Sequence, residues 1–414
     1  MHNRRVVVTG MGTVNPLGLS VDASWDAVKE GRSGITGITR FDASHLTSRI
    51  AGEVKDFDYH TVFDADMGKK AKRMDRFCHY AAAAAKEAVE QSGIDELDNR
   101  QRIGIGVGSG IGGLNVQHEN SVTMDQRGAR RVSPFYIPMS IGNMAAGILS
   151  MIYRATGPNM SPQTACATAN HAIAMSQLII QSNMADVMIA GGAESTINEL
   201  AIAAFSNMRA LSSRNDDPAG ASRPYDRDRD GFVLSEGAAI LVLEEYEHAR
   251  RRGAPILCEV LACGMSGDGY DFVAPDPKGV GARYAMHMAL DQAEINPDGI
   301  DYVNTHGTST PVGDIAEVLG VYDLFEHNTH NTFVGSTKSY HGHLLGATAG
   351  LEAILTICAI RDSLVPANLN LEHPDPELPD IRIPDEPVET EIRAALSNSF
   401  GFGGHNSSLV LSKM

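Results

Sequence analysis

Residues Gly231–Leu243 read GFVLSEGAAILVL, and residues Ser399–Leu411 read SFGFGGHNSSLVL. The two stretches align without gaps, with Phe232 opposite Phe400 and an apolar Leu-Val-Leu triplet at the end of each. Each is a glycine-rich turn that leads into an apolar strand. The repetition predicts that the chain is built from two related halves.

A weaker repetition pairs the Gly-Met of residues 10 and 11 with the Gly-Met of residues 264 and 265. Between them the run HARRRGAP interrupts the pattern near residues 250–257. We therefore expect an N-terminal half over residues 1–254 and a C-terminal half over residues 255–414.

Short apolar runs rich in β-branched residues alternate with longer helical stretches. Strands that alternate with helices favour an α/β architecture in which helices cover the sheets. The expected strands are Arg5–Thr9, Ile103–Val107, Val187–Ala190, Ala239–Leu243, Tyr302–Asn304 and Ser408–Leu411, and the expected helices include Tyr80–Gln91 and Ala172–Gln181.

Composition excludes several classes of protein. The formal net charge of −17 argues against a nucleic-acid partner, because phosphate contacts need a surplus of Lys and Arg. No uninterrupted apolar run is long enough to span a membrane, and the N-terminal stretch MHNRRVVVTGMGTVNPLG lacks the apolar core of a signal peptide. The 5 cysteines form no CxxC pair, which fits a reducing compartment, and we expect a cytoplasmic protein.

Cys166 lies in MSPQTACATANH, residues 160–171, where small residues precede a helical run. A helix N-terminus carries partial positive charge and unpaired N–H groups, which favour a thiolate and can hold an oxyanion. Cys166 is thus a candidate nucleophile, although a buried structural cysteine is the common alternative.

Three further segments combine glycine with reactive side chains. His306 follows a short strand in DYVNTHGTSTPVGD, at the kind of position where α/β folds place their sites. Lys338, His341 and His343 lie in VGSTKSYHGHLLGATAGLE, and NSFGFGGHN over residues 398–406 permits a tight loop that presents backbone N–H groups. A loop histidine that caps the backbone and a solvent-facing lysine are the plainer alternatives.

Two other kinds of site compete for these residues. Residues 108–113 read GSGIGG and match the dinucleotide-binding pattern G-x-G-x-x-G, but no acidic residue follows at the required distance, so we expect these glycines to make room at a subunit contact or an acyl pocket. His306, His341 and His343 could ligate zinc, yet no carboxylate that would orient them lies nearby in sequence.

One cysteine, two histidines and one lysine on separate glycine-rich loops suit thioester chemistry. Cysteine accepts an acyl group, and two N–H donors can stabilise the enolate that forms when a malonyl thioester loses CO₂. Attack of that carbanion on the acyl-cysteine is then effectively intramolecular.

At this point the chain resembles the β-ketoacyl-[acyl-carrier-protein] synthases, most closely the type II elongating class. The resemblance spans the whole length through VVVTGMGTVNPLG, MDRF, GSGIGG, SPFYIPMSIGNMAAG, TACAT, ADVMIAGGAE, ALSSRNDDPAGASRPYDRDRDGFVLSEGA, VNTHGTSTPVGD, STKSYHGHLLGATAGLEA and NSFGFGGHN. It implies a thiolase-like five-layered α-β-α-β-α fold from two duplicated halves, a homodimer, acyl carrier protein as the partner, and no metal or redox cofactor.

The resemblance also implies a role for individual residues. Cys166 would accept the acyl group, His306 and His343 would support decarboxylation, and Lys338 would tune the site with Glu352 as its partner. The remaining implied roles are backbone oxyanion-hole donors (Cys166, Phe402), an acyl pocket and its gate (Ile111, Phe402), pantetheine contacts (Thr308, Thr310) and carrier-protein docking (Lys69, Arg130, Arg209).

Related classes differ at these positions. A thiolase would have a second cysteine where Phe402 stands, initiating synthases have Asn at His343, and chain-length factors lack the nucleophile. His405, Asn170 and Asp271 depart from the elongating pattern. The expected activity is decarboxylative Claisen condensation that elongates fatty acids by two carbons, and the alternative is a ketosynthase of an aryl-polyene or polyketide pathway.

Overall fold

The computed structural model describes residues 4–414; residues 1–3 of the predicted N-terminal half lie outside the described residues. The elements up to residue 254 are β1 (Val6–Val14), α1 (Val21–Lys29), β2 (Thr36–Gly37), β3 (Ile50–Ala51), α2 (Ala65–Ala71), α3 (Arg76–Ser92), β4 (Ile103–Gly108), α4 (Leu114–Arg127), α5 (Tyr136–Ser140), α6 (Met144–Tyr153), β5 (Asn159–Met160), α7 (Thr168–Gln181), β6 (Val187–Glu194), α8 (Glu199–Asn207), β7 (Gly237–Glu245) and α9 (Tyr246–Arg251).

The remaining elements are β8 (Cys258–Gly267), α10 (Val280–Ala293), β9 (Tyr302–Asn304), α11 (Pro311–Leu324), β10 (Phe333–Gly335), α12 (Lys338–His341), α13 (Thr348–Asp362), β11 (Leu364–Val365), β12 (Val388–Glu389), β13 (Ala394–Gly401) and β14 (His405–Ser412). Every strand and helix predicted from sequence lies at least partly within one of these elements.

The two halves repeat the same topology. Within residues 4–414 the large sheet has the order β10-β9-β13-β14-β8-β1-β7-β6-β4-β5. In the first half β1 pairs antiparallel with β7, β7 antiparallel with β6, and β6 and β5 parallel with β4. In the second half β8, β14, β13, β9 and β10 repeat that arrangement strand for strand. A short β1–β8 pairing joins the two sections, so the predicted duplication is confirmed.

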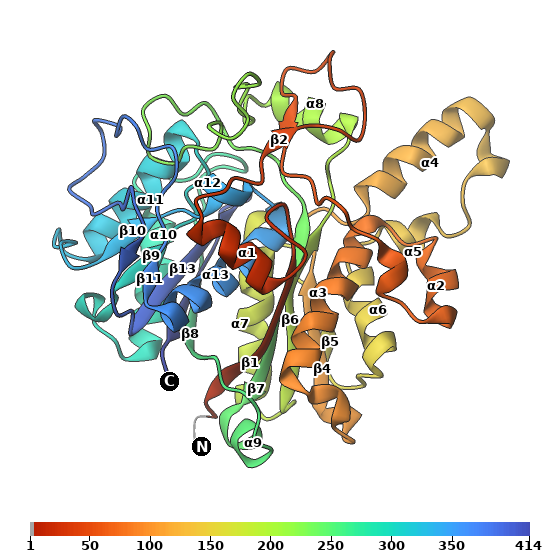
Figure 1. Ribbon diagram of the computed structural model, residues 1–414, viewed down its shortest axis with the longest axis horizontal. Coiled ribbons are helices and arrows are strands. Elements are labelled where there is room, and N and C mark those ends of the chain that lie inside the picture. The colour runs from red at the N-terminus through yellow and green to blue at the C-terminus, as the bar shows by residue number, and fades with distance from the viewer. Residues whose placement is uncertain (1–3) are drawn as a thin grey trace.

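Helices cover and separate the two sheet sections, which gives five layers (Figure 1). Helices α3 and α6 pack on the outer face of the first section, and α10, with α11 against it, packs on the outer face of the second. Between the sections lie α7 and α13, each of which contacts strands of both halves. The predicted α-β-α-β-α architecture is therefore confirmed.

The weaker Gly-Met repetition marks equivalent close contacts. A Cβ atom on Gly10 of β1 would lie 2.1 Å from the carbonyl oxygen of Ala88 in α3, and one on Gly264 of β8 would lie 1.9 Å from that of Ala285 in α10. Any side chain there would force the helix off the sheet. Glycine is thus required at the same place in each half.

Among residues 4–414, no helix has the combination of length and apolar character that crossing a membrane requires.

Candidate active site

Cys166 lies in a strained turn that opens the central helix α7. Ala165 has a φ of 50°, in the left-handed region, and is followed by a short 3₁₀ turn over Ala165–Ala167. The Thr168 hydroxyl accepts the Thr164 N–H and donates to the Ala165 carbonyl, which holds this turn closed. Leu345 has a φ of 47° at the equivalent place before α13, so each half builds the same sharp turn into its central helix.

The thiol of Cys166 is buried and protonated in the resting protein. Burial raises its pKa to about 12, and the nearby Lys338 amine and the backbone N–H groups of Phe402 and Cys166 only partly oppose this. We expected the helix N-terminus to favour a thiolate, but the raised pKa that burial causes favours the protonated thiol. The two N–H groups nevertheless lie beside the sulfur, as the oxyanion-hole expectation requires.

His343 contacts the sulfur directly. Its Nε2 lies 3.0 Å from Cys166 Sγ, and its Nδ1 lies 3.0 Å from Thr348 Oγ1 at the start of α13. The ring of Phe232 packs edge-on against the imidazole, with centroids 5.2 Å apart. Hydrogen bonds between the backbone of His343 and the segment around Val233 fix the main chain of His343. Together these contacts hold the imidazole in one orientation.

His306 completes the cluster from the end of β9. Its backbone N–H and that of Gly307 each donate to the Glu317 carboxylate at 2.8 Å. The His306 ring lies nearly perpendicular to that of His343, with centroids 5.4 Å apart, and its buried Nδ1 has no hydrogen-bond partner within residues 4–414. Reactive atoms of Cys166, His306 and His343 all lie within 4.8 Å of one another.

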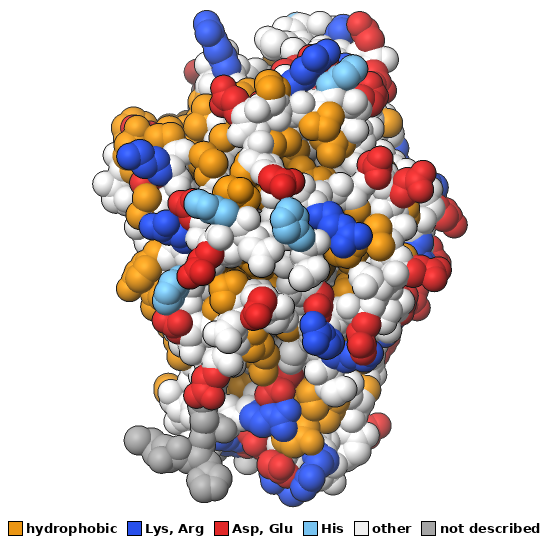
Figure 2. Space-filling view, turned by 90° about the vertical axis from the view of Figure 1, so that its left-hand side faces the viewer, with side chains coloured by type: hydrophobic (Ala, Val, Ile, Leu, Met, Phe, Trp, Pro, Cys, Tyr) orange, Lys and Arg blue, Asp and Glu red, His pale blue; other side chains and the backbone are white. Residues whose placement is uncertain are grey.

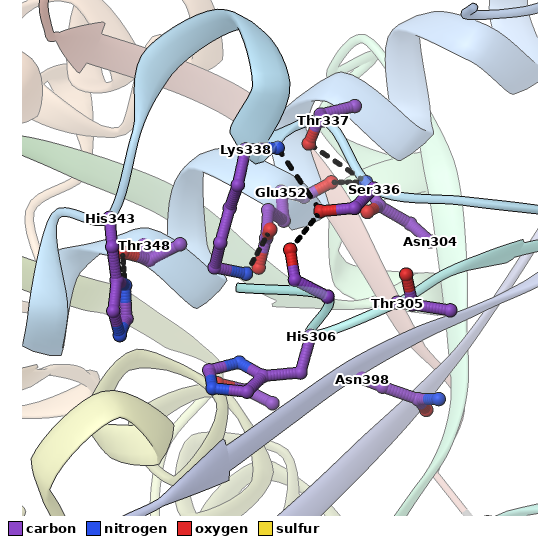
Figure 3. Close-up of polar contacts among 12 residues, drawn as sticks. Asn304, Thr305, His306, Ser336, Thr337, Lys338, His343, Thr348, Glu352 and Asn398 are labelled. Carbon is purple, nitrogen blue, oxygen red and sulfur yellow. Dashed lines mark hydrogen bonds and ion pairs between the residues drawn. The ribbon is translucent and has the colours of Figure 1, made fainter. Parts of the chain in front are cut away.

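Lys338 is fully buried behind the histidines. Its Nζ donates to Glu352 Oε1 at 2.5 Å, and Figure 3 shows this pair between the segments that carry His306 and His343. Burial raises the pKa of Glu352 to about 7, although the amine of Lys338 opposes the rise. Lys338 therefore supplies a buried amine beside the reactive atoms, and it does not face solvent.

The set of three zinc-ligating histidines considered from sequence is not assembled. His341 Nε2 lies 3.1 Å from Thr337 Oγ1 and its Nδ1 lies 2.8 Å from the Gly342 carbonyl, so both ring nitrogens are engaged away from His343. In the described part of the chain, two groups of side chains lie close enough together to bind a metal ion. One is the cluster of Cys166, His306 and His343, and the other contains Asp226 and His373. A third imidazole does not join His306 and His343.

The two histidines of the cluster are neutral. Burial and, next, the Lys338 amine hold the pKa of each well below its usual range, and His343 and His341 respectively add to the effect. A neutral imidazole carries one N–H donor and one acceptor nitrogen. Both rings can therefore donate a hydrogen bond to a developing oxyanion.

Burial lowers the pKa of His341 to about 3. The unfolded chain binds this proton below its ordinary pKa of 6.5 while the folded chain does not, so stability is lost as the pH falls below 6.5. Relative to a His341→Asn variant, we expect the wild-type free energy of unfolding to fall by about 2 kcal/mol between pH 7 and pH 5. Urea unfolding at both pH values measures this, and parallel pH profiles would contradict it.

A cavity of about 390 Å³ opens onto the reactive cluster. Ile111 and Phe402, the expected pocket and gate residues, line it, as do Thr308 and Thr310, whose hydroxyls lie 3.0 Å apart. Most other lining side chains are apolar, and they include Phe205, Met208, Phe232, Val273, Pro275, Val312 and Leu345. One cavity thus joins the cysteine, both histidines and an apolar channel.

Phe402 lies in the hairpin turn between β13 and β14, at the mouth of the site. A Cβ on the preceding Gly401 would lie 3.1 Å from the Cys166 N, and positive φ values at Gly403 and Gly404 close the turn. The expected loop over residues 398–406 is shorter than predicted, because residues 398–401 belong to β13.

The three departures from the elongating pattern lie around this turn and helix α7. His405 is exposed and packs edge-on to the ring of His171. Asp271 is exposed and accepts the N–H groups of Val273 and Ala274 in a loop that lines the cavity. Asn170 is buried and donates to the Ser397 carbonyl. None of them contacts the sulfur.

The glycines of the G-x-G-x-x-G match surround a carboxylate of the chain itself. The N–H groups of Gly110 and Ile111 donate to Glu194, and a Cβ on Gly108 would lie 2.2 Å from the Pro162 carbonyl oxygen. Gly110 and Ile111 line the cavity at Cys166, so the close packing of these glycines shapes one wall of that cavity.

Sequence reasoning missed three residues that position the cluster. Glu317 clamps the backbone of His306, Glu194 binds the pocket loop, and Thr348 contacts the His343 ring. The single carboxylate within the apolar run IAEVLGV, residues 315–321 of α11, is the signal that could have revealed Glu317, because isolated acids are rarely buried without a partner.

The five layers and the Cys-His-His cluster together define the thiolase-like class of condensing enzymes. The family model "Beta-ketoacyl synthase, N-terminal domain" matches residues 3–249, and "Beta-ketoacyl synthase, C-terminal domain" matches residues 257–372. The "3-oxoacyl-[acyl-carrier-protein] synthase 2" of Synechocystis sp. is 46% identical over 100% of this chain and 99% of that protein. The chain belongs to the β-ketoacyl synthase family, whose condensing enzymes are acyltransferases.

Solved structures agree with this assignment. A β-ketoacyl synthase from Burkholderia phymatum has a TM-score of 0.91 at 33% identity and covers 99% of this chain and 100% of that one. A type II PKS acyl-carrier protein in complex with its ketosynthase bound to the hexaketide has a TM-score of 0.91 at 27% identity, with 100% of both chains covered. The higher identity to the Synechocystis synthase favours fatty acid elongation over the polyketide alternative.

Proposed function

We propose that the protein is a 3-oxoacyl-[acyl-carrier-protein] synthase that extends a Cys166-bound acyl group by two carbons from malonyl-carrier protein. The convergence of Cys166, His306 and His343 within 4.8 Å in one cavity is the observation that carries the proposal. The reaction proceeds in three stages on this chain.

In the first stage, Cys166 Sγ attacks the thioester carbonyl of an acyl-carrier protein. The thiol donates to Nε2 of neutral His343, 3.0 Å away, while the Nδ1–H of that ring donates to Thr348. The carbonyl oxygen takes up negative charge beside the N–H groups of Cys166 and Phe402. The carrier thiol leaves with the proton, and the acyl group remains on sulfur.

In the second stage, malonyl-carrier protein loses CO₂. Acylated sulfur has no proton to donate. Proton exchange with solvent between the two half-reactions moves the single ring proton of His343 from Nδ1 to Nε2, and the Thr348 hydroxyl then donates to Nδ1. This leaves the Nε2–H of His343, together with an N–H of His306, to hold the thioester oxygen as enolate charge develops. Burial, with the Lys338 amine as the second cause, lowers the pKa of both rings, so each is a neutral hydrogen-bond donor.

In the third stage, the carbanion attacks the carbonyl carbon of the acyl-cysteine. The oxyanion again lies beside the N–H groups of Cys166 and Phe402, and collapse of the intermediate expels Sγ as a thiolate, which takes up from solvent the one proton that the reaction consumes. The product is 3-oxoacyl-carrier protein. Apart from the protons exchanged with solvent, every step uses groups of this chain and its two carrier substrates.

The shape of the cavity supports the assignment of the remaining pocket residues. The paired hydroxyls of Thr308 and Thr310 offer polar contacts to the amides of a pantetheine arm. The apolar lining that includes Ile111 suits an acyl tail, and Phe402 lines the same cavity.

Reconstitution with purified carrier proteins tests the proposed function. Acyl-carrier protein and malonyl-carrier protein together should yield 3-oxoacyl-carrier protein and an equal amount of CO₂. A series of saturated acyl groups of increasing length separates fatty acid elongation from a polyketide role. Absence of condensation with every acyl group of the series would overturn the proposal.

Assembly and organisation follow from the same assignment. We propose halves at residues 1–254 and 255–414, a cytoplasmic location and a homodimer. Strand β5 is an open edge of the sheet, and Met151 is an exposed apolar side chain on α6, which packs against β5. Pairing of two such edges by a twofold axis would cover them. Light scattering should give twice the mass of the chain.

Carrier-protein docking is proposed at the basic residues Lys69, Arg130 and Arg209, which are all exposed. Arg73 packs over the ring of Phe135, which brings the basic end of α2 beside the basic segment near Arg130. Arg209 follows Met208, which lines the cavity. The face over α10 and α11 instead mixes charges of both signs, as Figure 2 shows. If the carrier protein is acidic, this face attracts it less than the basic residues do.

Charge reversal at Arg209 should weaken carrier binding without harming chemistry. For Arg209→Glu we expect the KM for malonyl-carrier protein to rise about tenfold with kcat unchanged, and the difference to shrink at high salt. Arg250→Glu is the matched control, because Arg250 is exposed on α9 at the opposite end of the molecule from α8 (Figure 1). Equal effects of the two substitutions would contradict docking at Arg209.

A further inference from the structure

Glu194, the last residue of β6, ties together two loops of the active site. Its side chain is fully buried, and each carboxylate oxygen accepts two hydrogen bonds. Oε1 accepts from the Ser109 hydroxyl at 2.9 Å and from the Ile111 N–H at 3.3 Å. Oε2 accepts from the N–H groups of Gly110 at 2.7 Å and of Gly346 at 3.1 Å.

The two loops touch through glycine backbone at this point. A Cβ on Gly346 would lie 2.3 Å from the Gly110 N, and one on Gly110 would lie 3.2 Å from the Gly346 N. No side chain separates the loops, so two backbone N–H groups from the first loop and one from the second converge on one carboxylate. Glu194 is therefore their shared acceptor.

Both loops form walls of the cavity that holds Cys166. Gly110 and Ile111 line it from one loop, and Leu345, directly before Gly346, lines it from the other. His343 lies three residues before Gly346 on that second loop and contacts the cysteine sulfur at 3.0 Å. A shift of Gly346 relative to Gly110 would therefore change the pocket wall and the His343 segment together.

We propose that Glu194 is a positioning residue that holds the Ile111 wall of the acyl pocket against the His343 segment, and that it thereby sets the length of acyl chain the pocket accepts. This inference rests on the proposed function of the Cys166 site and adds the determinant of its acyl specificity. Glu194 acts through the two loops and does not touch the sulfur.

The chemistry of the clamp requires a carboxylate. A carboxylate presents acceptors on both oxygens, whereas a glutamine of the same shape offers one acceptor oxygen and one NH₂ group. That NH₂ group would face two of the hydrogen-bond donors that now contact one oxygen of the Glu194 carboxylate. Because a buried donor without a partner is costly, one loop should withdraw from the side chain while the other stays bound.

Glu194→Gln, compared with Glu87→Gln, tests the inference. Glu87 is the matched control, since its carboxylate accepts the N–H groups of Thr13 and Val21, away from the cavity. We expect kcat/KM for the longest accepted acyl-carrier protein to fall about tenfold more than for a short one in Glu194→Gln. Glu87→Gln should leave the ratio of long-chain to short-chain kcat/KM unchanged.

Ser109→Ala provides a second variant that removes one hydrogen bond from Glu194 and leaves the carboxylate in place. It should shift the chain-length ratio in the same direction by a smaller factor, and it decides the question if Glu194→Gln does not fold. A loss that is equal for every chain length, or an unchanged ratio in the folded variants, would overturn the inference. A wild-type protein that condenses no acyl group would instead overturn the proposed function.

Discussion

Replacement of Cys166 by alanine is expected to abolish acyl loading and to lower the rate of condensation by at least about 10³-fold. Sγ is the one atom of the cluster that can carry the acyl group, and His343 Nε2 lies 3.0 Å from it. Alanine at this buried position leaves the helix start intact, because residues 165 and 167 are already alanine. Product formation from radiolabelled malonyl-carrier protein measures the loss.

The same variant should keep its decarboxylase activity toward malonyl-carrier protein, since His306 and His343 remain and neither depends on the sulfur for its backbone contacts. Cys263→Ala is the matched control, because Cys263 is buried in β8 and does not line the cavity. Condensation at the wild-type rate in Cys166→Ala would show that another group carries the acyl chain. A comparable loss in Cys263→Ala would show that the defect is structural.

Removal of Glu352 should have the largest effect on stability. Glu352→Ala leaves the Lys338 amine fully buried without the carboxylate it contacts, and loss of one partner of a buried ion pair costs about 3–5 kcal/mol. Denaturant unfolding measures this change. Activity should also fall, because the amine beside His306 and His343 would no longer be fixed in place.

The double variant Lys338→Met with Glu352→Leu should recover much of the stability but not the activity, since it removes both buried polar groups together. Asp26→Ala breaks the exposed pair with Lys29 and should cost less than about 1 kcal/mol. If Glu352→Ala were no more destabilising than Asp26→Ala, the buried pair would not support the site.

The sequence pattern predicts the architecture because the duplication leaves a visible repeat at its most constrained places. Gly10 and Gly264 must be glycine for α3 and α10 to pack on their sheet sections. The repeated apolar strands, β7 and β14, lie in the interior of the large sheet. β13 escaped prediction as a strand because Ser397, Asn398 and Ser399 are polar residues in its buried interior, and the sequence therefore shows no apolar alternation there.

The reactive side chains could be named from sequence, but their electrostatics could not. Cys, His and Lys on glycine-rich loops indicate chemistry by residue type, whereas burial depends on packing from both halves. Burial reverses the expected direction of the pKa of Cys166. Glu194 was missed because it acts through contacts with a loop distant in sequence, 83 and 84 residues away at Ile111 and Gly110. Glu317 is only 11 residues from His306, but its contact is with backbone N–H groups, which residue type does not reveal.

The account depends on Cys166, His306 and His343 acting on one thioester. Incubation with acyl-carrier protein alone, acid quench and mass analysis of the proteolytic peptides locate the acyl group. We predict a single adduct of acyl mass on the peptide that contains Cys166, and its disappearance when malonyl-carrier protein is added to the wild type but not to a His306→Ala variant, which keeps the His343 contact that acyl loading uses. An acyl group on any other peptide, or its discharge by His306→Ala at the wild-type rate, would contradict the mechanism.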